Sequence, residues 1–147
     1  MIEIMEEKDL RGCVEVFFGV FTDEPWNYTW MNKNKVIKYF FDMFDTPNFV
    51  GYVYRINNKL AGACFGVVND YFLSSTYDVK ELFVSAEFQG TGVGSALMDF
   101  VELDLKKFEV SAVTLFTQQD IEAYSFYIKN GFVDSKKVVH MSKAING

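Results

Sequence analysis

The spacing of apolar and polar positions divides the chain into helical and extended segments. Apolar residues recur every three to four positions over 9–21 and 34–44, which predicts two amphipathic helices. The same spacing predicts a longer helix that follows a glycine-rich turn and ends near 107, and a last one ending at Asn130, with Asp120 as its N-cap and Gly131 after its end.

Shorter apolar runs between these segments predict strands. They cover 1–5, 49–56, 60–68, 77–84, 111–117, 132–134 and 138–141. Asn57 and Asn58 separate two of these runs and predict a hairpin turn. The segment 77–84 carries apolar residues on both faces, which indicates a central strand. Irregular loops are expected over 22–31 and 69–76.

The order of these elements predicts a mixed sheet with helices on its faces, so the fold class is α/β or α+β. We expect one domain over residues 1–147, because the chain has the usual length of a domain and no repeat, linker or low-complexity tract. Hydrophobic residues make up 50% of it, which favours a packed core over disorder.

The charge and the rarer residues exclude several classes of function. A net charge of −6 argues against nucleic acid as a partner and would suit a cationic one, although solubility alone also explains it. Cys13 and Cys64 have no metal-ligand spacing and are expected to be buried free thiols, and the lone His140 reads as a strand residue, so no metal is expected. No signal peptide or membrane span is apparent, which predicts a cytoplasmic protein with no membrane partner.

The first stretch that indicates chemistry is ELFVSAEFQGTGVGS, residues 81–95. A strand ends, a loop carries Gly90, Gly92 and Gly94, and a helix begins. Glycines let a backbone approach a ligand, and the N–H groups at a helix start bind anions, so a pyrophosphate would fit. A tight turn without a ligand is the alternative. The P-loop and dinucleotide fingerprints both fail here, because no lysine follows the glycines and the third glycine of the fingerprint is missing.

The second stretch is AYSFYIKNGF, residues 123–132. A helix that carries Tyr127 ends at Asn130 and Gly131, and an apolar segment follows. Tyr127 is either an aromatic core residue with its hydroxyl at the rim, or a proton donor at a cleft.

Together the two stretches resemble the GNAT superfamily of N-acetyltransferases. Gln89, Gly92 and Gly94 match its Gln/Arg-x-x-Gly-x-Gly/Ala signature, and Tyr127, Gly131 and Phe132 match its tyrosine-x-x-x-Gly-Phe pattern. The resemblance covers 78–132 closely and the order of elements over the whole chain.

The resemblance implies a mostly antiparallel sheet with splayed middle strands, helices on both faces, and acetyl-coenzyme A (acetyl-CoA) between those strands. Backbone groups near Phe83 and Val84 would bond its pantetheine arm. The pyrophosphate would be held by the turn, formed by Gln89, Gly90, Thr91, Gly92, Val93, Gly94 and Ser95. Asp120 stands where family members often have an asparagine that touches the cofactor arm, and helix capping is its alternative role.

Amine acetylation needs a base, an oxyanion donor and an acid for the departing thiolate. The resemblance assigns the oxyanion to the Val84 N–H and the acid role to Tyr127. For the base we favour Glu81, because it alternates with Val79 and Phe83 on an apolar strand face where burial would raise its pKa. A salt-bridged structural role for Glu81, or a water chain as the base, is the alternative.

The acceptor is expected at the loop 22–31. This loop mixes acids with aromatic faces, which suits a small cationic amine; its candidates are Asp23, Glu24, Trp26, Tyr28 and Trp30. The tryptophans could instead anchor the loop on the core. Protein N-terminal or lysine acetylation, a non-catalytic acyl-CoA-binding module and another nucleotide-binding α/β protein remain alternatives. The family implies a homodimer.

Overall fold

The computed structural model describes residues 1–146 and divides into two compact units, which are treated separately below. The first is Met1–Leu115 and the second starts at Phe116. The single domain expected from the sequence stays a prediction.

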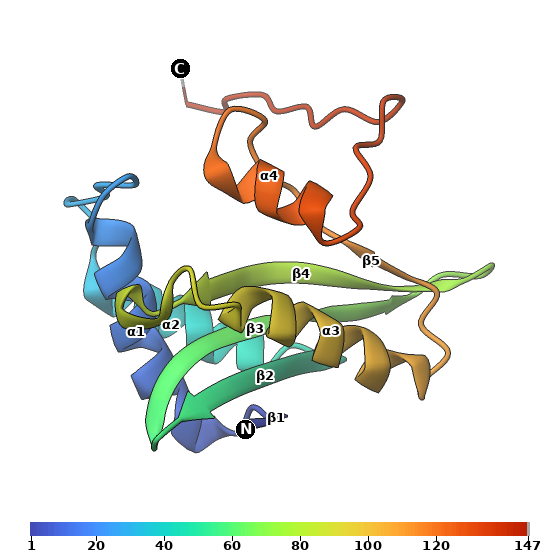
Figure 1. Ribbon diagram of the computed structural model, residues 1–147. Helices are drawn as coiled ribbons and strands as arrows, with labels where there is room; N and C mark the ends of the chain where they lie inside the picture. Colours follow the sequence, from blue (N-terminus) through green and yellow to red (C-terminus); the bar gives the residue numbers. More distant parts are fainter. Residues whose placement is uncertain (147) are drawn as a thin grey trace. The chain divides into compact units, whose positions relative to one another are not determined.

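The first unit is built on one five-stranded sheet (Figure 1). Its strands are β1 (Ile2–Ile4), β2 (Phe49–Ile56), β3 (Lys59–Asp70), β4 (Ser75–Val84) and β5 (Ala112–Thr114). They lie in chain order across the sheet. Neighbours from β1 to β4 are antiparallel, and β5 pairs with β4 in parallel. The expected mixed, mostly antiparallel sheet is confirmed.

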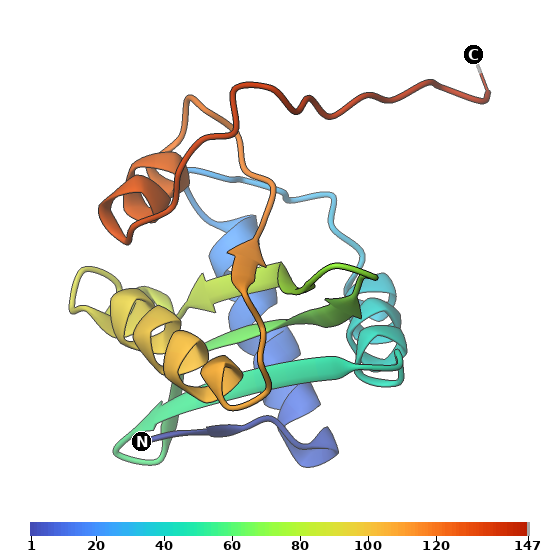
Figure 2. The same cartoon turned by 90° about the vertical axis from the view of Figure 1, so that its right-hand side faces the viewer.

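Helices cover both faces of this sheet, as the views in Figures 1 and 2 show. The unit holds α1 (Leu10–Thr22), α2 (Lys33–Phe44) and α3 (Val93–Lys106), with short 3-10 turns at Glu7–Asp9 and Ala86–Phe88. The apolar sides of α1 and α2 pack on one face around Phe40, Phe65 and Phe83. The stripe of α3 packs on the other face around Tyr52, Tyr77 and Leu97.

The connections between strands follow from local backbone chemistry. Asn57 and Asn58 both have positive φ, 52° and 63°, as a tight hairpin turn requires, and asparagine tolerates this region better than most residues. The loop expected over 69–76 is shorter than predicted. Asn69 pairs with Thr76 and Asp70 with Ser75, so the ladder continues almost to the tip of the hairpin.

A β-bulge interrupts the pairing of β3 with β4. Phe65 pairs with Glu81 while the next residue, Gly66, pairs with Val79, so Lys80 is an extra residue on β4. The backbones approach so closely here that a Cβ on Gly66 would lie 2.2 Å from the carbonyl oxygen of Asp78. Only glycine fits at this position without a shift of the strand.

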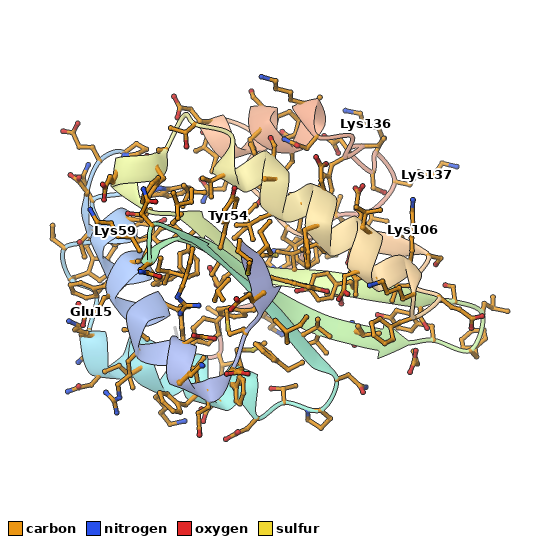
Figure 3. All side chains as sticks on the ribbon, turned by 60° about the horizontal axis from the view of Figure 1, so that its bottom comes forward. Glu15, Tyr54, Lys59, Lys106, Lys136 and Lys137 are labelled. Carbon is orange, nitrogen blue, oxygen red and sulfur yellow. The ribbon has the colours of Figure 1, made fainter. Side chains whose placement is uncertain are left out.

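A buried charge ties the start of α1 to β2. The side chain of Asp9, 3% exposed, accepts a hydrogen bond from Arg55 Nη2 at 2.6 Å and another from the Glu6 N–H at 2.8 Å. Charged side chains such as Glu15, Lys59 and Lys106 lie instead at the surface of this unit (Figure 3). Cys13 and Cys64 are buried free thiols, as expected.

The second unit contains α4 (Glu122–Lys129). Two expectations for this region are wrong. The helix N-cap is Ile121, so Asp120 does not cap it. The segments 132–134 and 138–141 are not strands, because no strand in the described part of the unit pairs with them. Ile128 on this helix is 44% exposed.

The end of α4 does follow the sequence. Gly131 has φ 91°, and the Phe132 N–H returns to the Tyr127 carbonyl at 3.0 Å.

Candidate active site

The strands β4 and β5 separate after only three paired residues. Asp78 and Thr114 form their last pair. The Asp78 carboxylate accepts hydrogen bonds from the side chains of Thr114, Thr76 and Asn69. The ladder is therefore closed by a polar cluster at the point of divergence, and no described strand pairs with that side of β4 beyond it.

The free side of β4 presents backbone groups at its end. In an antiparallel ladder, successive residues direct their N–H and C=O alternately to the two sides. The Ser85 N–H donates to Ala61 in β3 at 2.8 Å, so Val84 faces away from β3, toward the open side. The Val84 carbonyl there accepts a bond from Gln89 Nε2 at 3.0 Å. Of the two residues expected to bond pantetheine, Val84 thus faces the open edge, whereas Phe83 faces β3.

The glycine turn follows this edge directly. Gly90 and Gly92 have φ of 77° and 90°, and a Cβ at either would meet no atom within 4 Å, so the turn is open to solvent. Gly92 is the N-cap of α3, and the first helical bond runs from the Ala96 N–H to the Gly92 carbonyl at 3.0 Å. The N–H groups of Val93, Gly94 and Ser95 precede that bond, as the unpaired donors of a helix start.

A second glycine sets α3 close to the sheet. A Cβ on Gly62 in β3 would lie 2.9 Å from the Phe83 carbonyl oxygen and 3.1 Å from a Val93 methyl. This close packing holds the start of α3 beside the end of β4. The donors of the turn and the open backbone edge therefore fit a long ligand with a pyrophosphate group.

Glu81 is the ionisable group beside this edge. Its Oε2 accepts a hydrogen bond from the Tyr39 hydroxyl at 2.8 Å. Desolvation raises the pKa of Glu81 to about 7, and the bond from Tyr39 offsets part of the rise. The carboxyl therefore exchanges a proton near neutral pH, as a general base must. No described cation pairs with Glu81, in contrast to the salt-bridged alternative.

The face on which Glu81 lies differs in part from the expectation. Phe83 packs with the α1 and α2 side, and Glu81 meets Tyr39 of α2 on that same side. Val79, expected to share this face, packs on the α3 side. The extra residue Lys80 causes the difference, because it shifts the alternation of side chains by one position.

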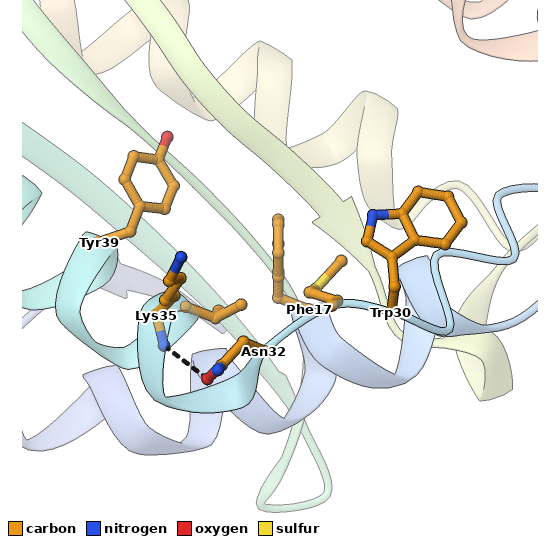
Figure 4. Close-up of a pocket in the computed structure, with 7 residues that line it drawn as sticks. Phe17, Trp30, Asn32, Lys35 and Tyr39 are labelled. Carbon is orange, nitrogen blue, oxygen red and sulfur yellow. Dashed lines mark hydrogen bonds between the residues drawn. The ribbon is translucent and has the colours of Figure 1, made fainter.

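A pocket of about 410 Å³ opens between α1 and α2 (Figure 4). Phe17, Trp30, Met31 and Val36 form its apolar lining, and Asn32, Lys35 and Tyr39 supply polar groups. Tyr39 both lines this pocket and bonds Glu81, so it connects the two.

The loop 22–31 contributes less to this pocket than the sequence indicates. Only Trp30 of its five candidates lines it, with 77% of its surface exposed. Trp26 packs on Phe21, with ring centroids 5.1 Å apart, and anchors the loop. The Tyr28 ring lies between those of Trp26 and Trp30, with centroid distances of 6.1 Å and 5.3 Å. Asp23 and Glu24 are exposed and do not line the pocket.

Tyr127 and Asp120 belong to the second unit. Tyr127 is half-buried on α4, and its ring makes edge contacts with Phe126 and Phe132, each at 5.3 Å. Asp120 is exposed just before the helix. The neighbouring hydroxyl of Tyr124 donates to Asp134 at 3.1 Å and lowers the pKa of that carboxyl.

Sequence reasoning missed the pocket residues outside the loop 22–31, which are Phe17, Asn32, Lys35, Val36 and Tyr39. Tyr39 lies next to Phe40 on an apolar helix and reads as core, and its partner Glu81 is 42 residues away. Lys35 reads as a solvated helix charge. The spacing of Lys35 and Tyr39, four residues apart on one helix face, is the signal that could have linked them.

The family model of the acetyltransferase (GNAT) domain matches residues 47–134, more than half of the chain. This chain belongs to the GNAT acetyltransferase family. An uncharacterized N-acetyltransferase of Pyropia yezoensis is 32% identical over 77 residues, which cover 52% of this chain and 41% of that protein. A homologous protein of Porphyra purpurea matches at 31% over the same shares. The matched part thus spans less than half the length of these curated relatives.

Solved structures share the fold. A possible acetyltransferase from Clostridium difficile 630 superposes with a TM-score of 0.84 at 12% identity, covering 99% of this chain and 98% of that one. An aminoglycoside acetyltransferase from an uncultured soil metagenomic sample, solved with sisomicin, gives 0.76 at 20% identity, with 99% and 96% covered. At such identities the likeness concerns the fold alone, and it confirms the expected GNAT-like architecture.

Proposed function

We propose that the chain transfers the acetyl group of acetyl-CoA to a primary amine by direct attack within a ternary complex. The observation that carries this proposal is the position of Glu81. A carboxyl with a pKa raised to about 7 lies on the same strand as the open backbone edge, which leads into the glycine turn. Acetyl-CoA, when bound, supplies an activated acetyl group as its thioester.

The residues of the chain would divide the work as follows. Glu81 accepts the proton that the ammonium form of the acceptor must lose, because only the free amine attacks a thioester. The Val84 N–H, which faces the open edge, donates to the oxygen that becomes negative. The nitrogen attacks and forms the C–N bond, and the thioester C–S bond breaks as the tetrahedral intermediate collapses. Tyr127 donates a proton to the sulfur, and the second proton that the nitrogen loses as it becomes the amide replaces it. The role of Tyr127 rests on the family pattern.

The cofactor assignment is tested at Gly92. A Gly92→Val variant places a branched side chain at φ 90° in the turn, so acetyl-CoA should no longer raise the melting temperature. Gly19→Val is the matched control, because a Cβ there also meets no atom within 4 Å and the position is on α1. A folded Gly92→Val protein with the thermal shift of the parent would refute the assignment.

The acid role is tested at Tyr127. Tyr127→Phe keeps the ring and removes the donor, so kcat should fall by about 10²–10⁴-fold while acetyl-CoA affinity stays unchanged. Tyr124→Phe removes a hydroxyl from the same helix and should leave kcat unchanged. A loss of stability without a loss of rate would identify Tyr127 as a core residue.

Turnover separates an enzyme from a non-catalytic acyl-CoA-binding module. Release of coenzyme A with any small amine would favour the enzyme, and turnover only with peptides would favour protein N-terminal or lysine acetylation. Asp23 and Glu24, from which the sequence predicts a cationic acceptor, do not line the pocket, so the support that remains for a cationic amine is the sisomicin complex of the metagenomic neighbour.

Location and assembly are proposals at the level of the family. No helix in the described part of the chain is long and apolar enough to cross a membrane. A cytoplasmic location, a homodimer and the absence of nucleic acid as a partner stay predictions.

A further inference from the structure

The three lysines of α2 have different environments. Lys33 forms an ion pair with Glu15 at 2.5 Å, and Lys38 forms one with Asp42 at 2.5 Å. Lys35 forms no ion pair with any described residue, and it is the only charged residue that lines the pocket. The pocket of this acidic protein therefore has a local positive charge and no carboxylate in its lining.

The rest of the pocket is suited to an apolar group. Phe17, Met31 and Val36 contribute apolar surface, and the Trp30 ring beside them is 77% exposed. A solvent-exposed tryptophan beside an apolar pocket is typical of a surface that a ligand covers.

The remaining polar end of the pocket leads to the base. The Tyr39 hydroxyl donates to Glu81 at 2.8 Å. Lys35 and Tyr39 are four residues apart on α2, so their side chains are neighbours on one helix face. The Lys35 ammonium and the Tyr39 hydroxyl, which contacts the proton acceptor Glu81, thus lie about one helical turn apart. Both line the same pocket as the apolar side chains.

We propose that the acceptor is an α-amino acid with a bulky apolar or aromatic side chain, acetylated on its α-amine. The carboxylate pairs with Lys35, the side chain packs against Trp30 and Phe17, and the amine points to Tyr39 and Glu81. This assignment rests on the proposed acetyl transfer and names its acceptor. It differs from a polycationic acceptor, which would bring like charges to Lys35 and find no carboxylate in the pocket lining.

The experiment measures coenzyme A release by the full chain with acetyl-CoA and a set of matched amines. L-phenylalanine has the α-amine, the carboxylate and the aromatic side chain that the proposal requires. L-phenylalaninamide lacks the negative charge, 2-phenylethylamine lacks the whole carboxyl group, and sisomicin is polycationic. We expect L-phenylalanine to have the highest kcat/KM of the four, and L-phenylalaninamide to have a KM several-fold higher.

A variant of Lys35 ties this preference to the pocket. Lys35→Gln should raise KM for L-phenylalanine about five-fold and leave KM for L-phenylalaninamide unchanged, because an exposed ion pair contributes at most about 1 kcal/mol. Lys38→Gln removes a charge that is also exposed, one turn away and outside the pocket lining, and should change neither KM.

The outcomes separate this inference from the proposed function. Turnover that is fastest with sisomicin, or a Lys35→Gln variant with an unchanged KM for L-phenylalanine, would overturn the acceptor class and leave acetyl transfer standing. Failure to release coenzyme A with any amine, despite a thermal shift with acetyl-CoA, would overturn the proposed enzyme and the acceptor class together.

Discussion

Along β4, residues 76–78 pair with a strand on both sides, whereas residue 79 and residues 81–84 pair only with β3. In the first half, polar side chains serve the ladder, because three donors converge on Asp78 where β5 leaves. In the second half, the backbone of Val84 faces an open side, and the desolvated carboxyl of Glu81 accepts a hydrogen bond from Tyr39. One strand thus supplies both a closed structural ladder and an open edge, with the bulge at Lys80 between them.

The largest effect is expected from Glu81 in the open half. Glu81→Gln keeps an oxygen that accepts the Tyr39 hydroxyl but removes the proton acceptor, so kcat should fall by about 10²–10⁴-fold. Circular dichroism and the acetyl-CoA thermal shift should match those of the parent. A variant with the rate of the parent would favour a water chain as the base.

Gly66 tests the bulge itself. A methyl group there would lie 2.2 Å from the Asp78 carbonyl, so Gly66→Ala should lower the free energy of unfolding by about 3 kcal/mol in urea titrations. The matched control is Gly19→Ala, on an exposed turn of α1, which should be neutral or stabilise by about 0.5–1 kcal/mol. Equal stabilities of the two variants would mean that the strands can separate at the bulge without loss.

The pH dependence of stability tests the desolvation of Glu81. Its pKa rises from 4.5 to about 7 on folding, so the native state holds a proton between these values that the unfolded state has released. Its contribution to stability is therefore full below pH 4.5 and decreases as pH rises to about 7, by up to about 3 kcal/mol.

Glu81→Gln should lack this dependence. The free energy of unfolding of Glu81→Gln minus that of the parent should therefore increase as pH rises from 4.5 to 8. Glu102→Gln, an exposed change on α3, should show no such trend. A constant difference between Glu81→Gln and the parent would place Glu81 in water.

The smallest effect is expected from the closed half. Asp78→Ala leaves three side-chain donors without their acceptor and should lower the free energy of unfolding by about 1–2 kcal/mol. Asp42→Ala, which removes an exposed helix pair, should lower it by about 0.5 kcal/mol or less. If Asp78→Ala also weakens the acetyl-CoA thermal shift, the hydrogen bonds to Asp78 set the separation of β4 and β5 at the cofactor site. An unchanged shift would mean that these bonds contribute to stability alone.

Sequence reasoning located most of the first unit because its signals are local. Helical spacing, the Asn57–Asn58 turn and the glycines before α3 each depend on neighbouring residues, and the structure confirms these elements. The failures depend on information outside a local window. Alternation assigned Val79 and Glu81 to one face, which holds only for a strand without an inserted residue.

Other failures concern partners distant in the sequence. The apolar runs at 132–134 and 138–141 have strand composition, but a strand exists only where another strand pairs with it. The Tyr39–Glu81 bond joins α2 to β4, and no pattern within either segment indicates it. The acidic composition of the loop 22–31 predicted an acceptor site there, but the charged residue that lines the pocket is Lys35. The spacing of Lys35 in the sequence does not distinguish it from the other lysines of α2.

The inserted residue on β4 has a consequence for chain length. Because Gly66 pairs with Val79 and Phe65 with Glu81, a deletion of Lys80 would leave both pairs, and every pair on either side of them, with their present partners. The shortened strand would lose the Lys80 side chain and the bend of the bulge, and would keep every other side chain of β4. A deletion of this one codon would therefore separate geometry from chemistry, since it changes the course of β4 while Glu81, Tyr39 and the glycine turn are all retained.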